Sequence, residues 1–289
     1  MLLRNSICPA GHKDNKAIQF MTIVPSNHSK EIKMKASELI KELCEGAFAP
    51  EVTCDTIKAG DAEKEIKRVG VTMFATVDVV RRAKEMGVDM LIVHEPTYYD
   101  HMDTDIPKTS VTVAKKQLIE ESGIVIWRYH DNMHYRVADM ITEGEMHYLG
   151  IKGEIKRTPY SASYVFECDE PITANSLAKI MREELGIKHL RISGEENKPS
   201  KRLGACFGTP GGVFELLCDE SIEIVMTGEA CEWKLAEYAR DACALGINKT
   251  LMVMGHVASE RDGMRLLAEK MKAKYPFETI YIECGEVYN

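Results

Sequence analysis

The sequence has no excess of positive charge. Its 289 residues include 37 Lys and Arg against 45 Asp and Glu, which gives a formal net charge of -8 at pH 7. Proteins that hold nucleic acid by its phosphates favour a basic face, so we do not expect nucleic acid as a partner, although a local basic patch stays open. The hydrophobic fraction of 45% and the charged fraction of 28% are typical of a soluble globular protein.

Long apolar runs and paired cysteines are also missing. No run approaches the ~20 apolar residues that cross a bilayer, so we expect no membrane association. The N-terminal segment has no sustained apolar core, and we expect no secretory signal. The nine cysteines include no C-x-x-C pair, so nothing indicates a zinc ribbon or a disulfide framework. Free thiols fit a reducing compartment, and we therefore predict a cytoplasmic protein.

The sequence does contain an alternation of strand-like and helix-like segments. Residues 1–33 mix polar residues without periodicity, and we expect a loose N-terminal arm. Residues 34–150 and 151–289 each show the order strand, helix, strand, which predicts an α/β fold and leaves a weak internal duplication open. In the first half, a helix predicted at 77–86 between two apolar strands forms a β-α-β unit, which predicts parallel strands.

The stretch around His94 carries the first sign of a functional site. Met90–Val93 is a continuous apolar run, as in a strand buried on both faces. The run ends at His94 and Glu95, and Pro96 then blocks further pairing. Open α/β sheets place their ligands beyond the carboxyl ends of strands. Taken alone, this stretch fits a polar loop after a strand equally well.

The same pattern recurs twice downstream. A second apolar strand runs into His130 and His134, and a third runs into His256 and Glu260. The last two residues share one face of a helix if the segment is helical, because they are four positions apart. Imidazole and carboxylate together suit zinc, iron, manganese or cobalt. Surface histidines explain one such cluster easily and three poorly, so we favour a metal site, and five or six ligands favour two ions.

Three further features carry weaker signals. Gly208–Gly212 reads G-T-P-G-G and could cradle a phosphate, but it matches no established glycine-rich pattern, so a tight turn into a helix is favoured. His101 and Asp103 could reach the rim of the metal site, although a solvated loop is the favoured interpretation. Trp127 and Trp233 are predicted to pack rather than to stack on a base.

Five motifs occur here in the order in which a known family has them. They are an early Asp-x-x-x-x-Gly (Asp55–Gly60), His94-Glu95-Pro96, His130-Asp-Asn-Met-His134, Thr227-Gly-Glu229 and Gly255-His-Val-Ala-Ser-Glu260. With these motifs, nearly all of the chain after residue 34 resembles the NIF-three-like family of dinuclear-metal proteins. Members of that family often carry the name GTP cyclohydrolase type 2 homologue.

The resemblance implies an α/β fold of two similar halves with mixed sheets, a two-metal centre and a toroidal homohexamer. It implies His94, His256 and Glu260 as metal ligands, and these match the family directly. Glu95 stands where the family has His, and His134 stands where it has Asp. Both are therefore predicted ligands of exchanged type, and the set keeps three imidazoles and two carboxylates. We expect two divalent first-row ions, with zinc, iron and manganese as the candidates.

Two hypotheses about function follow. The first is a metal-dependent hydrolase that acts on a small substrate, and the resemblance suggests a nucleotide such as GTP. His130, which is not among the predicted ligands, is then the candidate for proton transfer or support of a ligand. The second hypothesis is a metal-binding scaffold or regulator without catalysis, which acts through protein partners. Turnover of a nucleotide or phosphoester separates the two.

Overall fold

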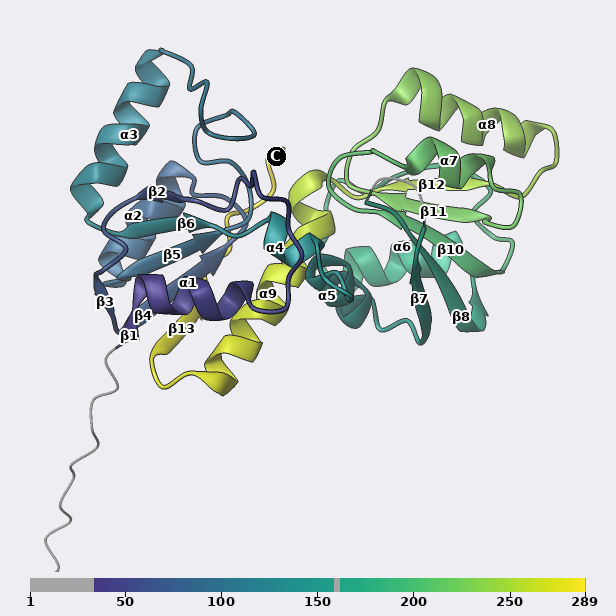
Figure 1. The fold of residues 1–289 in the computed structure, drawn as a ribbon. Helices are drawn as coiled ribbons and strands as arrows, with labels where there is room; N and C mark the ends of the chain where they lie inside the picture. Colours follow the sequence, from purple (N-terminus) through teal and green to yellow (C-terminus); the bar gives the residue numbers. More distant parts are fainter. Residues whose placement is uncertain (1–33, 159–161, 289) are drawn as a thin grey trace, which may run out of the picture. The chain divides into compact units, whose positions relative to one another are not determined.

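A computed structural model describes residues 34–158 and 162–288 (Figure 1). The predicted N-terminal arm, residues 1–33, lies outside the described residues. The described strands form a five-stranded sheet, a six-stranded sheet and a two-stranded ribbon. Both large sheets contain parallel and antiparallel pairs. The prediction of an α/β fold with mixed sheets is confirmed.

The five-stranded sheet is assembled from distant parts of the chain. Its order is β13-β4-β5-β6-β2, in which β13, β4, β5 and β6 run parallel and β2 pairs antiparallel with β6 at one edge. The strands are β13 (Glu278–Tyr281), β4 (Arg68–Thr72), β5 (Met90–Val93), β6 (Val125–Arg128) and β2 (Ile57–Ala59). The last strand of the chain thus pairs with the first sheet.

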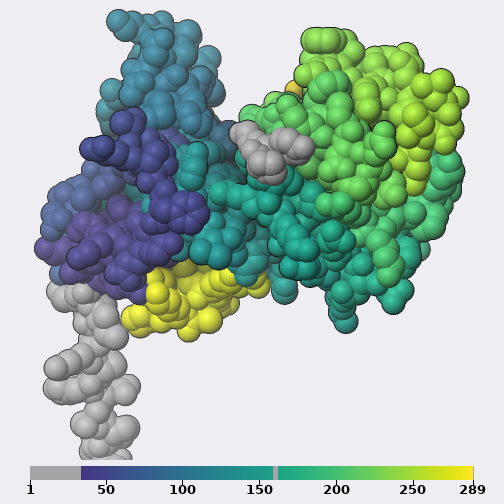
Figure 2. Space-filling model, turned by 45° about the vertical axis from the view of Figure 1, so that its right-hand side comes forward, coloured from purple at the N-terminus to yellow at the C-terminus, as the bar shows by residue number. Residues whose placement is uncertain are grey.

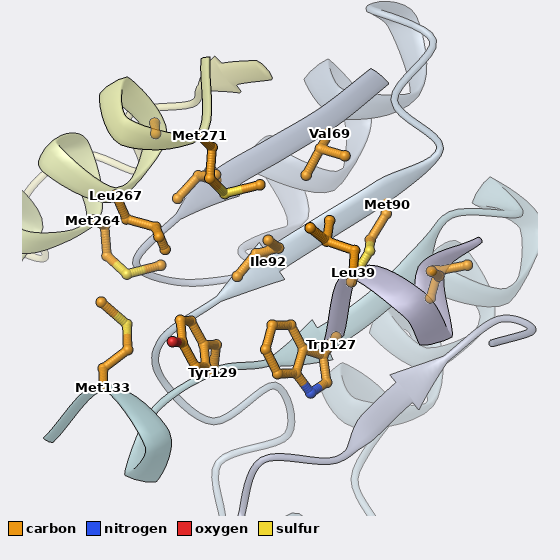
Figure 3. Close-up of a cluster of buried hydrophobic side chains, with 14 of the residues drawn as sticks. Leu39, Val69, Met90, Ile92, Trp127, Tyr129, Met133, Met264, Leu267 and Met271 are labelled. Atoms are coloured by element: carbon orange, nitrogen blue, oxygen red, sulfur yellow. The ribbon is translucent and has the colours of Figure 1, made fainter. Parts of the chain in front are cut away.

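Helices cover both faces of this sheet. Helix α1 (Ala36–Cys44) packs on one face, and α2 (Val77–Glu85) and α3 (Ser110–Ser122) pack on the other. The Thr76 hydroxyl caps α2 by accepting the N–H of Val79, and β4 and β5 run parallel as the β-α-β prediction requires. On the α1 side, Figure 3 shows apolar side chains from α1, β4, β5 and β6 meeting side chains of the C-terminal helix.

The six-stranded sheet has the order β7-β8-β10-β11-β12-β9. Helix α6 (Ala174–Glu183) packs on one face. Helix α7 (Val213–Cys218) and helix α8 (Glu237–Ala244), with its preceding π-helical turn η1 (Glu232–Ala236), pack on the other. The strands are β7 (Gly153–Arg157), β8 (Tyr164–Ile172), β10 (Ser200–Cys206), β11 (Ile224–Thr227), β12 (Thr250–Val253) and β9 (Arg191–Gly194).

Two helices cross at a pair of glycines and connect the two cores. Helix α9 (His256–Lys274) begins after β12, and its residues contribute to the apolar clusters of both sheets. It packs against α5 (Met140–Leu149), and a Cβ added at Gly144 would lie 2.3 Å from the Cα of Gly263. The helices can approach this closely only because both positions lack a side chain.

The remaining short elements lie at the edges. Strands β1 (Met34–Lys35) and β3 (Glu65–Ile66) form the two-stranded ribbon. The segment after α1 lies beside the segment near residue 135 on the surface shown in Figure 2. The N–H of Phe48 donates to the carbonyl of Tyr135 and joins the two segments. Within the described residues, no helix combines the length and the apolar character needed to cross a membrane.

Two of the weaker sequence interpretations are wrong. Trp233 does not pack, since 77% of its surface is exposed, whereas Trp127 is buried as predicted. Asp103 is not solvated. Its buried carboxylate lies 3.2 Å from Lys58 Nζ and accepts the N–H of Tyr98 at 2.7 Å. The ion pair and the backbone donors compensate for the loss of water around this carboxylate.

Candidate metal centre

His94 and Glu95 sit where β5 ends, as predicted. Both backbone N–H groups donate to the carbonyl of Met73, at 3.1 and 2.9 Å, which turns the chain toward the site. The Nδ1 of His94 lies 3.0 Å from the carbonyl of Tyr129, so Nδ1 carries the hydrogen and Nε2 is left with its lone pair. Burial, with a smaller contribution from His130 and His134, holds the pKa of His94 well below its usual range.

A short helix presents His130 and His134. This helix, α4 (Asp131–His134), is held by the carboxylate of Asp55. Asp55 accepts the backbone N–H groups of His130, Asp131 and Asn132 at 2.8, 2.9 and 2.8 Å. One carboxylate therefore satisfies the free donors at the start of α4 and fixes the segment that follows β6.

His134 faces His94 across the site. Its Nε2 lies 3.3 Å from the Nε2 of His94, while its Nδ1 lies 2.7 Å from Oδ2 of Asp139. Burial alone would lower the pKa of His134, but the charge and the hydrogen bond of Asp139 outweigh it and raise that pKa to about 9. The Asp139 carboxylate thus orients the imidazole with Nε2 toward the site.

His256 and Glu260 complete the cluster from the first turn of α9. The Nδ1 of His256 lies 2.6 Å from Oε1 of Glu229, and its Nε2 lies 3.0 Å from Oε1 of Glu95. Oε2 of Glu260 lies 3.2 Å from His256 Nε2 and 3.7 Å from His94 Nε2. Burial opposes protonation of His256, but the carboxylates of Glu260 and Glu95 prevail and raise its pKa to about 11.

The chemistry of this cluster fits a divalent cation. Oε2 of Glu260 is buried and accepts no hydrogen bond from the described residues, although it lies between two imidazole nitrogens. The Nε2 atoms of His94 and His134 lie 3.3 Å apart, and both rings are held by their Nδ1 atoms. A buried carboxylate oxygen without a donor and two converging lone pairs are costly unless a cation or a proton lies among them.

Glu95 has a second partner besides His256. Oε2 of Glu95 lies 3.6 Å from Nη2 of Arg128, a fully buried side chain whose Nε donates to the carbonyl of His94 at 2.9 Å. Burial raises the pKa of Glu95, but the hydrogen bond from His256 and the nearby histidines hold it below the usual range. Glu95 is therefore ionised, with one oxygen toward the cluster and the other toward Arg128.

His130 lies close enough to the cluster to be a ligand itself. Its ring centroid is 4.6 Å from that of His94 and 4.7 Å from that of His134, and its Nδ1 lies 2.9 Å from Oδ1 of Asp131. Ligand atoms of these three histidines lie within 4.8 Å of one another, as do those of His94, Glu95 and Glu260. The structure thus brings all six predicted site residues into one cluster, and the division into ligands and a proton carrier stays a prediction.

The cluster opens into a cavity of about 530 Å³. His101 lines this cavity, with its ring centroid 5.8 Å from that of His130. The Gly208–Gly212 loop packs beside the cluster, where a Cβ at Gly208 would lie 2.3 Å from Oε1 of Glu260. The backbone N–H of Gly208 donates to Ser259, and the loop turns into α7, which confirms the favoured interpretation of a turn.

Several residues that shape the cluster were missed in the sequence. For Arg128 there was one indication of a special role in the sequence, since it is a charged residue inside an apolar strand. Asp139 precedes a helix, as capping residues do, and its Oδ1 accepts the N–H of Thr142. Nothing in the sequence indicated that the same carboxylate would contact His134. Arg157, which lines the cavity, lies on the exposed strand β7 and had no signal.

Comparison with known proteins assigns the chain to a family. The model of the family Duf34/NIF3 (NGG1p interacting factor 3) matches residues 34–286. The chain belongs to the DUF34/NIF3 family. The resemblance inferred from the motifs is therefore confirmed, and the family assignment covers both sheets and every residue of the cluster.

Curated relatives in this family are distant in sequence. The GTP cyclohydrolase 1 type 2 homolog of Clostridium perfringens is 23% identical over 238 residues, which cover 80% of this chain and 87% of the relative. The protein of the same name from Chlamydia pneumoniae is 23% identical over 253 residues, which cover 80% of this chain and 90% of the relative.

Solved structures share the fold. The protein ybgI, described as of unknown function, has a TM-score of 0.72 at 19% identity, covering 88% of this chain and 100% of that chain. Reduced HcgD from Methanocaldococcus jannaschii has a TM-score of 0.68 at 19% identity. The match covers 86% of this chain and 98% of that chain. At this identity the likeness shows a common fold.

Proposed function

We propose that this DUF34/NIF3 protein is a hydrolase that uses two divalent first-row ions and acts on a small substrate. The observation that carries the proposal is the buried Oε2 of Glu260, which lies between two imidazole nitrogens without a hydrogen-bond donor. Such an oxygen would suit a metal ligand, since a bound cation would compensate its charge. His94, Glu95, His134, His256 and Glu260 would hold the ions, with zinc, iron and manganese as the candidates.

Bound ions of this kind would lower the pKa of a coordinated water and polarise the substrate. The chain's own residues supply orientation and proton transfer. Asp139 and Glu229 hold the Nδ1 atoms of His134 and His256, which directs both Nε2 atoms inward. Asp131 holds Nδ1 of His130, whose Nε2 is then available to accept a proton from water and return it to a leaving group.

The cavity and the names of relatives support a nucleotide-sized substrate. A volume of about 530 Å³ lies within the range of small-ligand sites. Curated relatives carry the name GTP cyclohydrolase 1 type 2 homolog, and GTP is therefore the first substrate to test. We also propose a homohexamer, on the strength of the family resemblance, and a cytoplasmic location, because the cysteines show no paired pattern and free thiols fit a reducing compartment.

A second candidate function is a metal-binding scaffold that acts through protein partners. Its support is the family description, NGG1p interacting factor 3, which names a protein interaction. In that case the cluster would bind ions without turning over a substrate, and the cavity would not be a substrate site.

Elemental analysis of tag-free protein, followed by a turnover assay, tests the proposal. We expect about two ions per chain after reloading with zinc, iron or manganese. Glu260→Gln should lose ions and turnover together, whereas Glu183→Gln, on the exposed face of α6, should keep both. A fully loaded wild type that hydrolyses neither GTP nor any other nucleotide or phosphoester in a panel would favour the scaffold.

A further inference from the structure

The cavity above the metal cluster has one permanently cationic side chain among the described residues that line it. This is Arg157, at the end of β7. The cluster itself contains the carboxylates of Glu95, Asp131 and Glu260 and the histidines, and the buried guanidinium of Arg128 lies behind Glu95, outside the lining of the cavity. Arg157 in the lining of this cavity does not help to hold cations, because a positive charge repels them. Its position therefore indicates another role.

Arg157 is held in place by the network that orients His134. Its Nε and Nη2 donate to the hydroxyl of Tyr164 at 3.1 and 2.8 Å, and Nη2 also donates to the carbonyl of His134 at 2.9 Å. The Tyr164 hydroxyl in turn donates to Oδ2 of Asp139 at 2.8 Å. The guanidinium is therefore fixed relative to a predicted metal ligand, and little conformational entropy is lost when it binds a further group.

The Nη1 group of the Arg157 guanidinium is available to bind a ligand. Within the described part of the chain, no residue accepts a hydrogen bond from Nη1, and the side chain is 40% exposed. Neutralisation of Asp139 does not account for Arg157, since the two lie 4.0 Å apart and Asp139 already accepts from His134 and Tyr164 at 2.7 and 2.8 Å.

We propose that Arg157 binds a phosphate group of the substrate, in the cavity beside the loaded metal centre. This inference rests on the proposed function, since it assumes that the cavity is the substrate site. A planar guanidinium with a free N–H edge suits a phosphate oxygen, and a fixed charge beside the centre would select anionic over neutral substrates. The carboxylates of the cluster repel an anion, so phosphate should bind well only when divalent ions compensate their charge.

Calorimetric titration of zinc-loaded protein with inorganic phosphate, at constant ionic strength, tests the assignment. Arg157→Gln should weaken phosphate binding by about 10-fold or more, because a charge-assisted hydrogen bond is lost. Arg157→Lys should weaken it less, since the charge remains. The matched control is Arg240→Gln on the surface of α8, where Arg240 pairs with Glu237, and it should bind like the wild type.

The outcomes separate this inference from the proposed hydrolase. Metal content is measured for each variant. The inference is overturned if Arg157→Gln binds phosphate as the wild type does. It is also overturned if Arg157→Gln loses metal while Arg157→Lys keeps it, because Arg157 would then act by supporting His134. If phosphate binding depends on Arg157 but no substrate in the panel is turned over, the phosphate site stands and the hydrolase fails. If turnover occurs and Arg157→Gln leaves it unchanged, the hydrolase stands and the phosphate site fails.

Discussion

His134 and Asp139 form a buried pair in which Nδ1 of the imidazole lies 2.7 Å from Oδ2 of the carboxylate. The other carboxylate oxygen, Oδ1, caps α5 by accepting the N–H of Thr142 at 2.8 Å. The pair raises the pKa of His134 to about 9 and, against the effect of burial, lowers that of Asp139 to about 2. One residue therefore begins a helix and orients a predicted metal ligand.

The first prediction concerns this pair. Asp139→Asn keeps the size and the capping ability of the side chain but removes its charge. We expect metal affinity to fall about 10–100-fold, because the substitution removes the partner that orients His134. The metal-free protein should also lose stability near pH 7, because this carboxylate stabilises the protonated imidazole of His134 in the folded state. Competition with a chromogenic chelator measures the affinity, and Asp169→Asn on the exposed part of β8 serves as the control. Unchanged affinity would show that His134 is not a ligand.

The second prediction concerns the exchanged ligand types. Glu95→His and His134→Asp should each weaken metal loading, and the double substitution should recover part of it, a non-additive result in a double-mutant cycle. Recovery should be incomplete because Arg128 faces Glu95 and Asp139 faces His134. An aspartate at 134 would meet the Asp139 carboxylate, and two close carboxylates repel each other.

Adding Asp139→Asn to that double variant removes the repulsion and should raise loading further. Metal content of the five proteins, measured by elemental analysis after identical reloading, gives the comparison. If the effects of Glu95→His and His134→Asp simply add, one of the two residues does not touch a metal ion, and pairing with Arg128 becomes the better account of Glu95.

The third prediction is that Asp55 holds the segment from His130 to His134. Its carboxylate accepts three backbone N–H groups and the side-chain amide of Asn132 at 2.8 Å. Asp55→Ala should lower the free energy of unfolding of the metal-free protein by about 2–4 kcal/mol, because these donors lose a charged acceptor. Urea unfolding measures the change, with the exposed Asp241→Ala as control. A loss no larger than that of the control would contradict this role.

The fourth prediction is that metal loading releases protons. The pKa of His134 is raised to about 9 and that of His256 to about 11, so both rings are protonated near pH 7 before metal binds. Ligands must be deprotonated, and loading should therefore release about two protons per chain at pH 7 and become tighter as the pH rises. The buried His94 contributes none, since its pKa is already low.

A pH-indicator dye in weak buffer records the release on addition of zinc, and the comparison is made between pH 6 and pH 8. If metal loading weakens as the pH rises, or if no proton is released at pH 7, then metal binding does not displace protons from His134 and His256.

The fifth prediction tests the crossing of α5 and α9. Gly144→Ala favours the helix by about 1 kcal/mol on intrinsic propensity alone. We nevertheless expect a net loss of about 1–3 kcal/mol, since the new Cβ would lie 2.3 Å from the Cα of Gly263 and the helices must separate. Thermal or urea unfolding measures the loss, with Lys116→Ala on the exposed face of α3 for comparison. A gain in stability would mean that the crossing relaxes without cost.

The sequence alone determined the buried strands that lead into the cluster and the residues that follow them, but not the short or exposed strands β1, β2, β3 and β7. Met90–Val93 forms β5 as predicted, because a strand buried on both faces consists of a continuous apolar run that needs no distant partner to be recognised. His94 and His130 follow β5 and β6, parallel neighbours whose carboxyl ends lie at one edge of the five-stranded sheet, whereas His256 follows β12 of the six-stranded sheet. The family could therefore be predicted from local patterns, and so could the residues that come together in the cluster.

Tertiary structure alone decided which groups surround those residues. Strand β13 pairs with β4, more than 200 residues earlier, and no local pattern specifies the partner of a strand. Arg128 faces Glu95, Asp139 faces His134 and Glu229 faces His256, and each contact joins side chains whose sequence neighbours do not indicate it. The charge and orientation of a ligand depend on such contacts, since Coulomb and hydrogen-bond interactions act over a few ångströms in space whatever the distance along the chain.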